Sequence, residues 1–166
     1  MCAINGFNWK DEDLVKKMNL ITSHRGPDGT LVFVGEAISL GHNRLSIIDL
    51  SERASQPMQS EDGNLVITYN GELYNFKELK EELKGFYKFN TDSDTEVILA
   101  SYKKWGNNCI SRFRGMFAFA IWDKQENKLF LARDQTGVKP LYYYFVGGKF
   151  IFSSEIKGIL EHNVSR

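Results

Sequence analysis

The chain alternates between segments with a helical spacing of apolar residues and short segments rich in strand-forming residues. Apolar side chains that recur every three or four positions predict amphipathic helices over residues 11–21, 75–84 and 93–105, with a short fourth helix over residues 154–160. Asp92, Ser93 and Asp94 carry side chains that favour the start of the third helix.

Runs of apolar and aromatic residues between turn signals predict strands over residues 2–7, 31–34, 37–48, 65–69, 116–122, 128–133, 141–146 and 149–153. Asn70-Gly71 lies between the strand that ends at Tyr69 and the helix that starts at Asn75, so we expect a strand-to-helix corner with exposed backbone N–H groups. An Asn-Gly pair is also typical of a plain turn. Strands and helices in blocks indicate an α+β fold, with helices covering antiparallel sheets.

Composition bounds the class of protein. The chain has 166 residues, of which 42% are hydrophobic, which is enough for one soluble domain with its own core. Lys and Arg (21) balance Asp and Glu (21), which argues against a dedicated nucleic-acid or membrane-surface binder. Because no signal-peptide pattern and no run of 18 apolar residues occurs, we expect no membrane partner and a cytoplasmic location.

The two cysteines, Cys2 and Cys109, lie far apart in the sequence, which indicates a reducing compartment rather than a disulfide framework. The chain has no Cys-x-x-Cys motif. His24, His42 and His162 show no paired spacing either, so we expect no metal site.

The first two residues have distinctive chemistry. Removal of Met1 is expected because the next residue is small, and it would leave the thiol of Cys2 beside a free α-amino group. An N-terminal amine titrates at about 7.7–8.0, close to the ~8.5 of a free thiol, so it is a suitable base near neutral pH. On position alone, however, Cys2 is more simply a small apolar residue in a first strand.

Eight motifs extend this picture: MCAI (residues 1–4), HRGPDG (24–29), RLSIID (44–49), YNGELYN (69–75), SDTEVIL (93–99), GMFAFAIWD (115–123), RDQTGVKPLYY (133–143) and FSSEIK (152–157). In this order the chain resembles the N-terminal glutaminase domain of glutamine-hydrolysing asparagine synthetases. These domains are class II glutamine amidotransferases of the N-terminal-nucleophile type. The resemblance spans nearly the whole chain and implies a four-layer αββα sandwich with two antiparallel sheets face to face.

The resemblance also implies catalytic roles. Cys2 would attack the side-chain amide of glutamine, form a glutamyl thioester and release ammonia, after which water would release glutamate. The Asn70 side-chain amide and the Gly71 backbone N–H would form an oxyanion hole. Arg25 and Gly26 would help to place the thiol.

The charged ends of glutamine need partners as well. The resemblance assigns Arg44, whose planar fork matches two oxygens, to the α-carboxylate, and Glu72 and Asp94 to the α-ammonium. Taken singly, Arg44 could be a solvated strand charge, Glu72 a first-turn residue and Asp94 an acid at a helix N-terminus. Residues 24–29 are expected to wall the pocket, and the further glutamine contacts are expected from Leu45, Ser46, Ile47 and Ile48.

The expected partner is a synthetase domain or subunit that accepts ammonia. No Ser-Gly-Gly-x-Asp pyrophosphate loop occurs, and the chain ends where glutaminase domains of this family usually continue. We therefore expect residues 1–166 to form a C-terminally incomplete glutaminase domain without a synthetase domain. It would need no cofactor itself, since ATP and Mg serve only the synthetase. The resemblance also allows a homodimer of the full-length enzyme.

Two alternatives remain for the function. The domain could supply ammonia to another acceptor, such as a sugar phosphate or a phosphoribosyl donor, although HRGPDG and SSEIK favour the asparagine synthetase branch. It could also be a non-catalytic regulatory domain of the same fold. That alternative would require the loss of Cys2, Arg44, Asn70 or Asp94, and all four are present.

Overall fold

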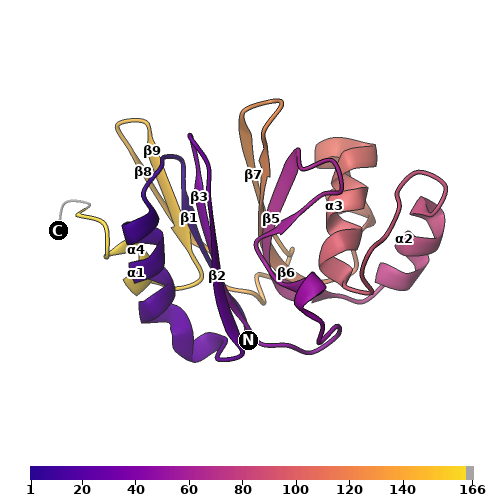
Figure 1. The fold of residues 1–166 in the computed structure, drawn as a ribbon, viewed down its shortest axis with the longest axis horizontal. Coiled ribbons are helices and arrows are strands. Elements are labelled where there is room, and N and C mark those ends of the chain that lie inside the picture. The colour runs from indigo at the N-terminus through magenta and orange to yellow at the C-terminus, as the bar shows by residue number, and fades with distance from the viewer. Residues whose placement is uncertain (164–166) are drawn as a thin grey trace.

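The computed structural model describes residues 1–163 of the expected domain, and residues 164–166 lie outside the described part (Figure 1). The elements in chain order are β1 (Ala3–Phe7), α1 (Glu12–Thr22), η1 (Ser23–Arg25), β2 (Gly29–Val34), β3 (Ser39–Arg44), η2 (Glu52–Ala54), β4 (Met58–Gln59), β5 (Leu65–Leu73), α2 (Phe76–Leu83), α3 (Asp94–Trp105), η3 (Gly106–Arg112), β6 (Gly115–Asp123), β7 (Lys128–Arg133), β8 (Tyr142–Val146), β9 (Lys149–Ser153) and α4 (Ile156–Ile159).

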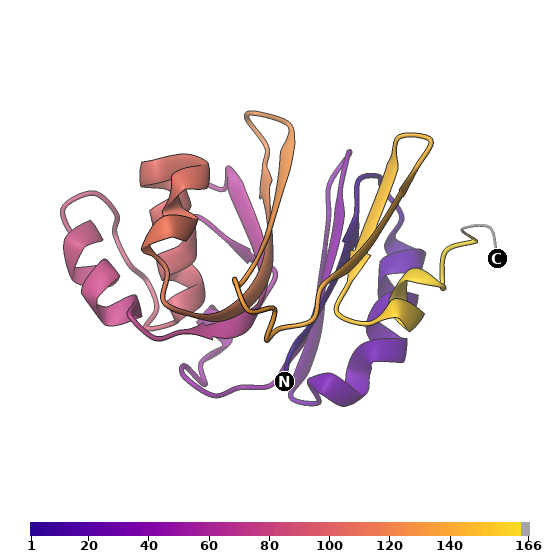
Figure 2. The ribbon, with the colours of Figure 1, turned by 180° about the vertical axis from the view of Figure 1, so that it is seen from behind.

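The strands form two antiparallel sheets that face each other. One sheet has the order β2-β3-β1-β9-β8 and the other the order β4-β5-β6-β7. Helices α1 and α4 cover the outer face of the first sheet, while α3, with α2 beyond it, covers the outer face of the second (Figures 1 and 2). The expected four-layer α+β sandwich is therefore confirmed.

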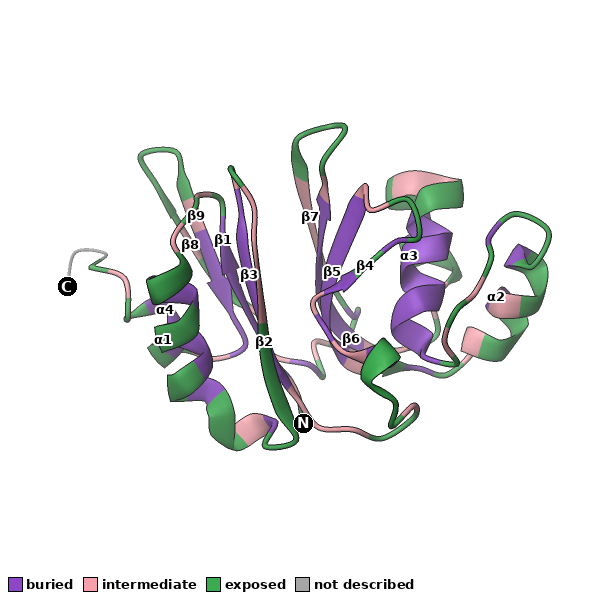
Figure 3. Cartoon of the chain, in the orientation of Figure 1, coloured by how far each residue is buried: buried purple, intermediate pink, exposed green. Residues whose placement is uncertain are grey.

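Alternation along the strands explains the layers, since successive side chains point to opposite faces of a sheet. On β5, Val66 belongs to the apolar cluster between the sheets, whereas Leu65 and Ile67 belong to the cluster against α3. A third cluster, including Phe7 and Met18, lies between the first sheet and α1. Burial is accordingly concentrated in the strands and the inner faces of the helices (Figure 3).

Two predicted strand boundaries are wrong. The strand expected over residues 37–48 ends at Arg44, and the following residues form a loop. The strand expected to end at Tyr69 continues to Leu73, so Asn70-Gly71 is not a corner. Pairing with β6 holds every residue of β5 and overrides the local turn preference of Asn-Gly, and the chain leaves the sheet only before α2.

Candidate active site

Alternation also brings the candidate catalytic side chains together. Arg44 lies two residues beyond His42 on β3, and Asn70 lies two residues beyond Thr68 on β5. Even-numbered residues of these strands face the space between the sheets. The register of β1 with β3 pairs Ala3 with Asn43, which brings the preceding Cys2 beside Arg44.

A cavity of about 120 Å³ opens at this end of the sandwich. All ten residues predicted to act on or bind glutamine line it, namely Cys2, Arg44, Leu45, Ser46, Ile47, Ile48, Asn70, Gly71, Glu72 and Asp94. Residues 24–29 do not line the cavity, so their expected role as a wall is wrong. They lie behind Cys2 and Arg44, as the contacts of Arg25 and Gly26 show.

The Cys2 thiol is held by the loop that follows β3. The backbone N–H of Leu45 donates to Sγ at 3.3 Å, and Sγ lies 3.6 Å from the Leu45 carbonyl oxygen. Burial raises the pKa of the Cys2 thiol, while the Leu45 N–H, the amino terminus, Arg44 and Lys139 oppose that rise. A base close to the thiol is therefore needed for attack near neutral pH.

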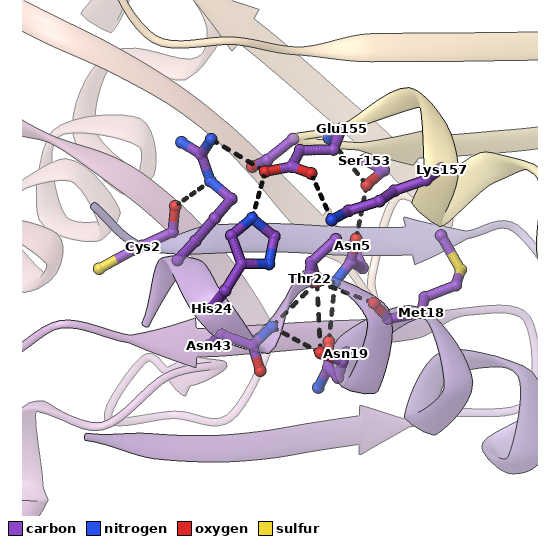
Figure 4. A network of polar contacts seen from close by, with 12 residues as sticks. Cys2, Asn5, Met18, Asn19, Thr22, His24, Asn43, Ser153, Glu155 and Lys157 are labelled. Atoms are coloured by element: carbon purple, nitrogen blue, oxygen red, sulfur yellow. Dashed lines mark hydrogen bonds and ion pairs between the residues drawn. The ribbon is translucent and has the colours of Figure 1, made fainter. Parts of the chain in front are cut away.

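Arg25 fixes the backbone of Cys2 from behind. Its Nε donates to the Cys2 carbonyl oxygen at 3.1 Å, and its Nη1 pairs with Glu155 at 3.3 Å. Figure 4 shows Glu155 placed between His24 and Lys157, which also pair with it. Arg25 thus links Cys2 to the segment that follows β9.

Gly26 allows the chain to pass close to β3. A Cβ atom at this position would collide with the backbone carbonyl of Asn43 and lie 2.7 Å from the carbonyl carbon of Arg44. The close approach positions the strand end that carries Arg44, so the contribution of Gly26 is steric.

Two donors belong to residues that line the cavity, Asn70 and Gly71, and have no hydrogen-bond acceptor within residues 1–163. Asn70 is 2% exposed, and its Nδ2 has no hydrogen-bond partner within residues 1–163. A buried donor without a partner costs about 1–3 kcal/mol, so such an atom in a cavity is suited to a ligand.

The second donor is the Gly71 N–H. At the two ends of the β5–β6 pairing, the Tyr74 N–H donates to the Arg114 carbonyl oxygen and the Lys124 N–H donates to the Asn64 carbonyl oxygen. The even-numbered residues of β5 therefore bond to β6. Because the direction alternates along an antiparallel strand, the backbone groups of the odd-numbered residues point away from β6. On that edge, β4 pairs only as far as Ile67. No side chain of the described residues accepts from the Gly71 N–H, which is left to face the cavity.

Gly71 must also be glycine for packing reasons. An added Cβ would collide with the Met116 carbonyl oxygen and lie 2.8 Å from the Cα of Phe117. These contacts explain why the position accepts only glycine.

Asp94 is a buried carboxylate at the start of α3. It is 4% exposed and accepts hydrogen bonds from the Tyr69 hydroxyl at 2.8 Å and the Leu73 N–H at 2.9 Å. Burial raises its pKa, and these two hydrogen bonds oppose the rise. It forms no ion pair with a basic side chain of residues 1–163, so a cationic ligand group in the cavity would satisfy it. Glu72, in contrast, is exposed at the rim.

Arg44 organises the loop around the cavity. Its Nη1 donates to the Ser51 carbonyl oxygen at 3.0 Å and to Ser55 Oγ at 3.2 Å, and its Nη2 donates to the Asp49 carbonyl oxygen. The reading of Arg44 as a simple solvated strand charge is therefore wrong. The guanidinium holds the loop whose residues 45–49 all line the cavity.

Several cavity residues were not predicted from the sequence. Lys139 is 6% exposed and lines the cavity, where its Nζ lies 3.6 Å from Met1 Sδ. Gln56 and Tyr69 line it as well. Tyr69 and Lys139 stand in two of the listed motifs without an assigned role in the site, and Gln56 stands outside the motifs, so only the tertiary fold identifies these residues as part of the cavity. Within the described residues no group of three or more potential metal-ligating side chains occurs, and no helix is long and apolar enough to cross a membrane.

The fold matches that of a solved structure. The glutamine phosphoribosylpyrophosphate amidotransferase of Bacillus subtilis superposes with a TM-score of 0.78 at 23% identity, over 96% of this chain and 43% of that chain. The two chains therefore share the fold of the four-layer sandwich.

Sequence relatives define the family. The family model described as a glutamine amidotransferase domain matches residues 1–166. The chain is 44% identical to a putative glutamine-hydrolyzing asparagine synthetase 2 of Methanocaldococcus jannaschii, over 96% of this chain and 35% of that protein. It is 49% identical to glutamine-hydrolyzing asparagine synthetase 1 of Bacillus subtilis, over 90% of this chain and 24% of that protein. The chain therefore belongs to the glutamine amidotransferase domain family.

Proposed function

We propose that this domain hydrolyses the side-chain amide of glutamine, with Cys2 as nucleophile and the α-amine of Cys2, freed by removal of Met1, as base. The observation that carries the proposal is the pair of unpartnered donors, Asn70 Nδ2 and the Gly71 N–H, in the cavity that the thiol also lines. Cleavage of an amide needs hydrogen-bond donors that stabilise the negative charge developing on the carbonyl oxygen.

Attack begins when the amine takes the thiol proton. The sulfur then bonds to the amide carbon of glutamine, and the carbonyl electrons move to oxygen, where the Asn70 and Gly71 donors stabilise the charge. As the C–O double bond re-forms, the C–N bond breaks and the ammonium group of Cys2 returns its proton to the leaving nitrogen. The products of this half-reaction are ammonia and a glutamyl thioester.

The second half-reaction uses water. The Cys2 amine accepts one proton from water while the hydroxide oxygen bonds to the thioester carbon, and the same oxyanion donors stabilise the second tetrahedral intermediate. The C–S bond then breaks and the sulfur recovers its proton. The sum is glutamine plus water to glutamate plus ammonia, and the groups used all belong to this chain. We therefore expect no cofactor for this step.

Binding of the unreacting end of glutamine involves opposite charges at two sides of the cavity. The buried Asp94 carboxylate is suited to the α-ammonium, with Glu72 at the rim. Arg44 is suited to the α-carboxylate, both by its charge and because it holds the loop from Leu45 to Ile48 in place. Arg25 and Gly26 support the nucleophile and the Arg44 strand from behind.

We further propose that the ammonia is used for the ATP-dependent conversion of aspartate to asparagine. The support is that both named sequence relatives are asparagine synthetases of which this chain spans 35% and 24%. ATP and Mg would serve a synthetase domain or subunit. We place the reaction in the cytoplasm, because the free thiols of Cys2 and Cys109 suit a reducing compartment.

Product analysis tests the proposed function. Protein freed of Met1 is incubated with glutamine in the absence of ATP, and glutamate and ammonia are quantified together. We expect equal amounts of both products from the unaltered protein and neither from a Cys2→Ala variant. Absence of glutamate from correctly folded, Met1-free protein would refute the function.

A further inference from the structure

Beside the cavity, the edge of β5 has no partner strand among residues 1–163. β4 pairs with β5 only through Val66 and Ile67, so the backbone groups of Tyr69 and Gly71 on that side have no strand to bind. Edge groups of this kind are normally solvated or covered. Here Tyr69, the residue before Asn70, is only 3% exposed, so solvent covers little of it.

We propose that His42 and Gln56 substitute for the missing strand and act as positioning residues that hold the Asn70–Gly71 peptide in its oxyanion-binding position. The inference rests on the proposed glutaminase function and deepens it. Neither residue needs to touch glutamine in this role, since both act through the backbone of Tyr69.

His42 holds the carbonyl side of Tyr69. Its Nε2 lies 3.1 Å from the Tyr69 carbonyl oxygen, and because a carbonyl only accepts, Nε2 must carry the hydrogen. The imidazole is 1% exposed, and its Nδ1 has no partner within residues 1–163. Burial, helped by Arg44, lowers the pKa of His42 to about 4, which agrees with a neutral ring.

His42 contacts two of the strands that carry the site. On β3 it pairs with Ile4 of β1 and precedes Arg44 by two residues. Its side chain crosses to β5, in the opposite sheet, at the residue before Asn70. The backbone of His42 thus belongs to the pairing of β3 with β1, and its side chain connects β3 to β5.

Gln56 holds the amide side of Tyr69. Its Oε1 accepts from the Tyr69 N–H at 2.6 Å, and its Nε2 donates to Thr95 Oγ1 at 3.2 Å. The second bond sets the orientation of the amide and ties it to the start of α3, next to Asp94. The Tyr69 hydroxyl also bonds to Asp94, so the N–H, the carbonyl and the hydroxyl of Tyr69 are all held. The N–H of Gly71, two residues further on, therefore keeps its direction.

Loss of either contact should let the β5 edge shift while leaving the substrate-binding charges in place. The expected change is therefore in turnover rather than in binding of glutamine. We expect His42→Leu and Gln56→Met to lower kcat about tenfold to a hundredfold, the range in which small misplacement of catalytic groups acts, with KM within about threefold. His42→Gln, which returns an N–H donor of similar reach, should recover most of the loss.

The experiment compares these three variants with unaltered protein and with Thr68→Val as a matched control. Thr68 is fully buried and makes another contact between the sheets, from its Oγ1 to the Gly41 carbonyl oxygen at 3.1 Å. All proteins are freed of Met1, checked for folding by circular dichroism, and assayed for kcat, KM and inhibition by glutamate γ-semialdehyde. The aldehyde forms a tetrahedral adduct with a thiol, whose oxygen requires the oxyanion donors.

The positioning role predicts that kcat and aldehyde affinity fall together in His42→Leu and Gln56→Met and remain near normal in Thr68→Val. Normal kcat and aldehyde affinity in the folded variants would overturn it, as would an equal loss in Thr68→Val. If His42→Leu does not fold, Gln56→Met and His42→Gln decide between the same outcomes. Absence of glutaminase activity from unaltered protein would instead refute the proposed function, and the positioning role with it.

Discussion

At the scale of single residues, the site contains polar groups whose hydrogen bonds or charges are not satisfied by the described residues. Asn70 Nδ2 is buried without an acceptor, and the carboxylate of Asp94 is buried without a cation among the described residues. Such groups lower stability unless a ligand completes them. A ligand with a carbonyl oxygen and an ammonium group would complete both.

Replacement of Asn70 tests the oxyanion donor. Asn70→Ala should lower kcat by roughly 10²–10³, the usual loss for one such donor, because it removes an interaction that strengthens only in the transition state. Steady-state kinetics of glutamate release measure the effect. A folded Asn70→Ala protein that turns over at the normal rate would remove Asn70 from the mechanism.

The charged partners of glutamine should behave differently. Asp94→Asn keeps the shape of the side chain but removes the charge for the α-ammonium, and should raise KM about tenfold to a hundredfold, as expected for a charged hydrogen bond worth ~1.5–3 kcal/mol. Arg44→Lys should also raise KM, because lysine cannot keep the forked contacts to the loop. A normal KM in both variants would contradict this binding mode.

Burial of His42 also makes stability depend on pH. The pKa of His42 is about 4 in the folded protein and about 6.5 in an unfolded chain, so the unfolded state binds more protons between these values. Stability should therefore fall by about 3 kcal/mol from this group as pH drops from above 6.5 to 4. Urea unfolding across this window should show a smaller fall for His42→Gln. Parallel curves for the two proteins would contradict a buried neutral His42.

At the scale of secondary structure, helices were easier to predict than strand ends. The apolar spacing of α1 and α3 is long and regular, and their starts at Asp11 and Ser93 have side-chain caps that the sequence displays. The extent of β5 could not be read in this way, because Asn70-Gly71 has a local turn preference that only pairing with β6 overrides. Boundaries set by tertiary contacts have no local signal.

The same limit applies to the site. Cys2, Asn70 and Asp94 stand in recognisable motifs and indeed line one cavity. His42 and Gln56 lie outside the residues assigned to catalysis, and their contacts depend on a meeting of two sheets. Sequence motifs therefore identified residues that line the cavity. The residues that hold those side chains in place could be identified only once the fold was known.

Close packing between η1 and β3 gives a test at this scale. Gly26→Ala should lower the free energy of unfolding by about 1–3 kcal/mol, because the added Cβ collides with the Asn43 carbonyl and the neighbour is backbone. Activity should fall as well, because Arg44 directly follows Asn43 and would shift with it. Gly85→Ala is the matched control, with nothing within 4 Å of the added atom. Equal stability of both variants in urea unfolding would contradict the steric role.

At the scale of the whole molecule, both sheets contribute to one end of the sandwich, and the amino terminus enters there. Cys2 directly precedes β1 and Arg44 ends β3, while β5 supplies Asn70 and α3 supplies Asp94. Met1 lines the same cavity, next to Lys139. Removal of Met1 would therefore clear space for glutamine and release the amine needed as base.

The most direct measurement of the central claim is covalent labelling by a diazoketone analogue of glutamine, located by mass spectrometry. Cys109 is fully buried, and burial raises its pKa to about 12, so it serves as the internal control. We expect one label per chain, on Cys2, in protein freed of Met1, and almost none in protein that retains Met1. A label on Cys109, no label on active protein, or equal labelling of Cys2 in both forms would contradict it.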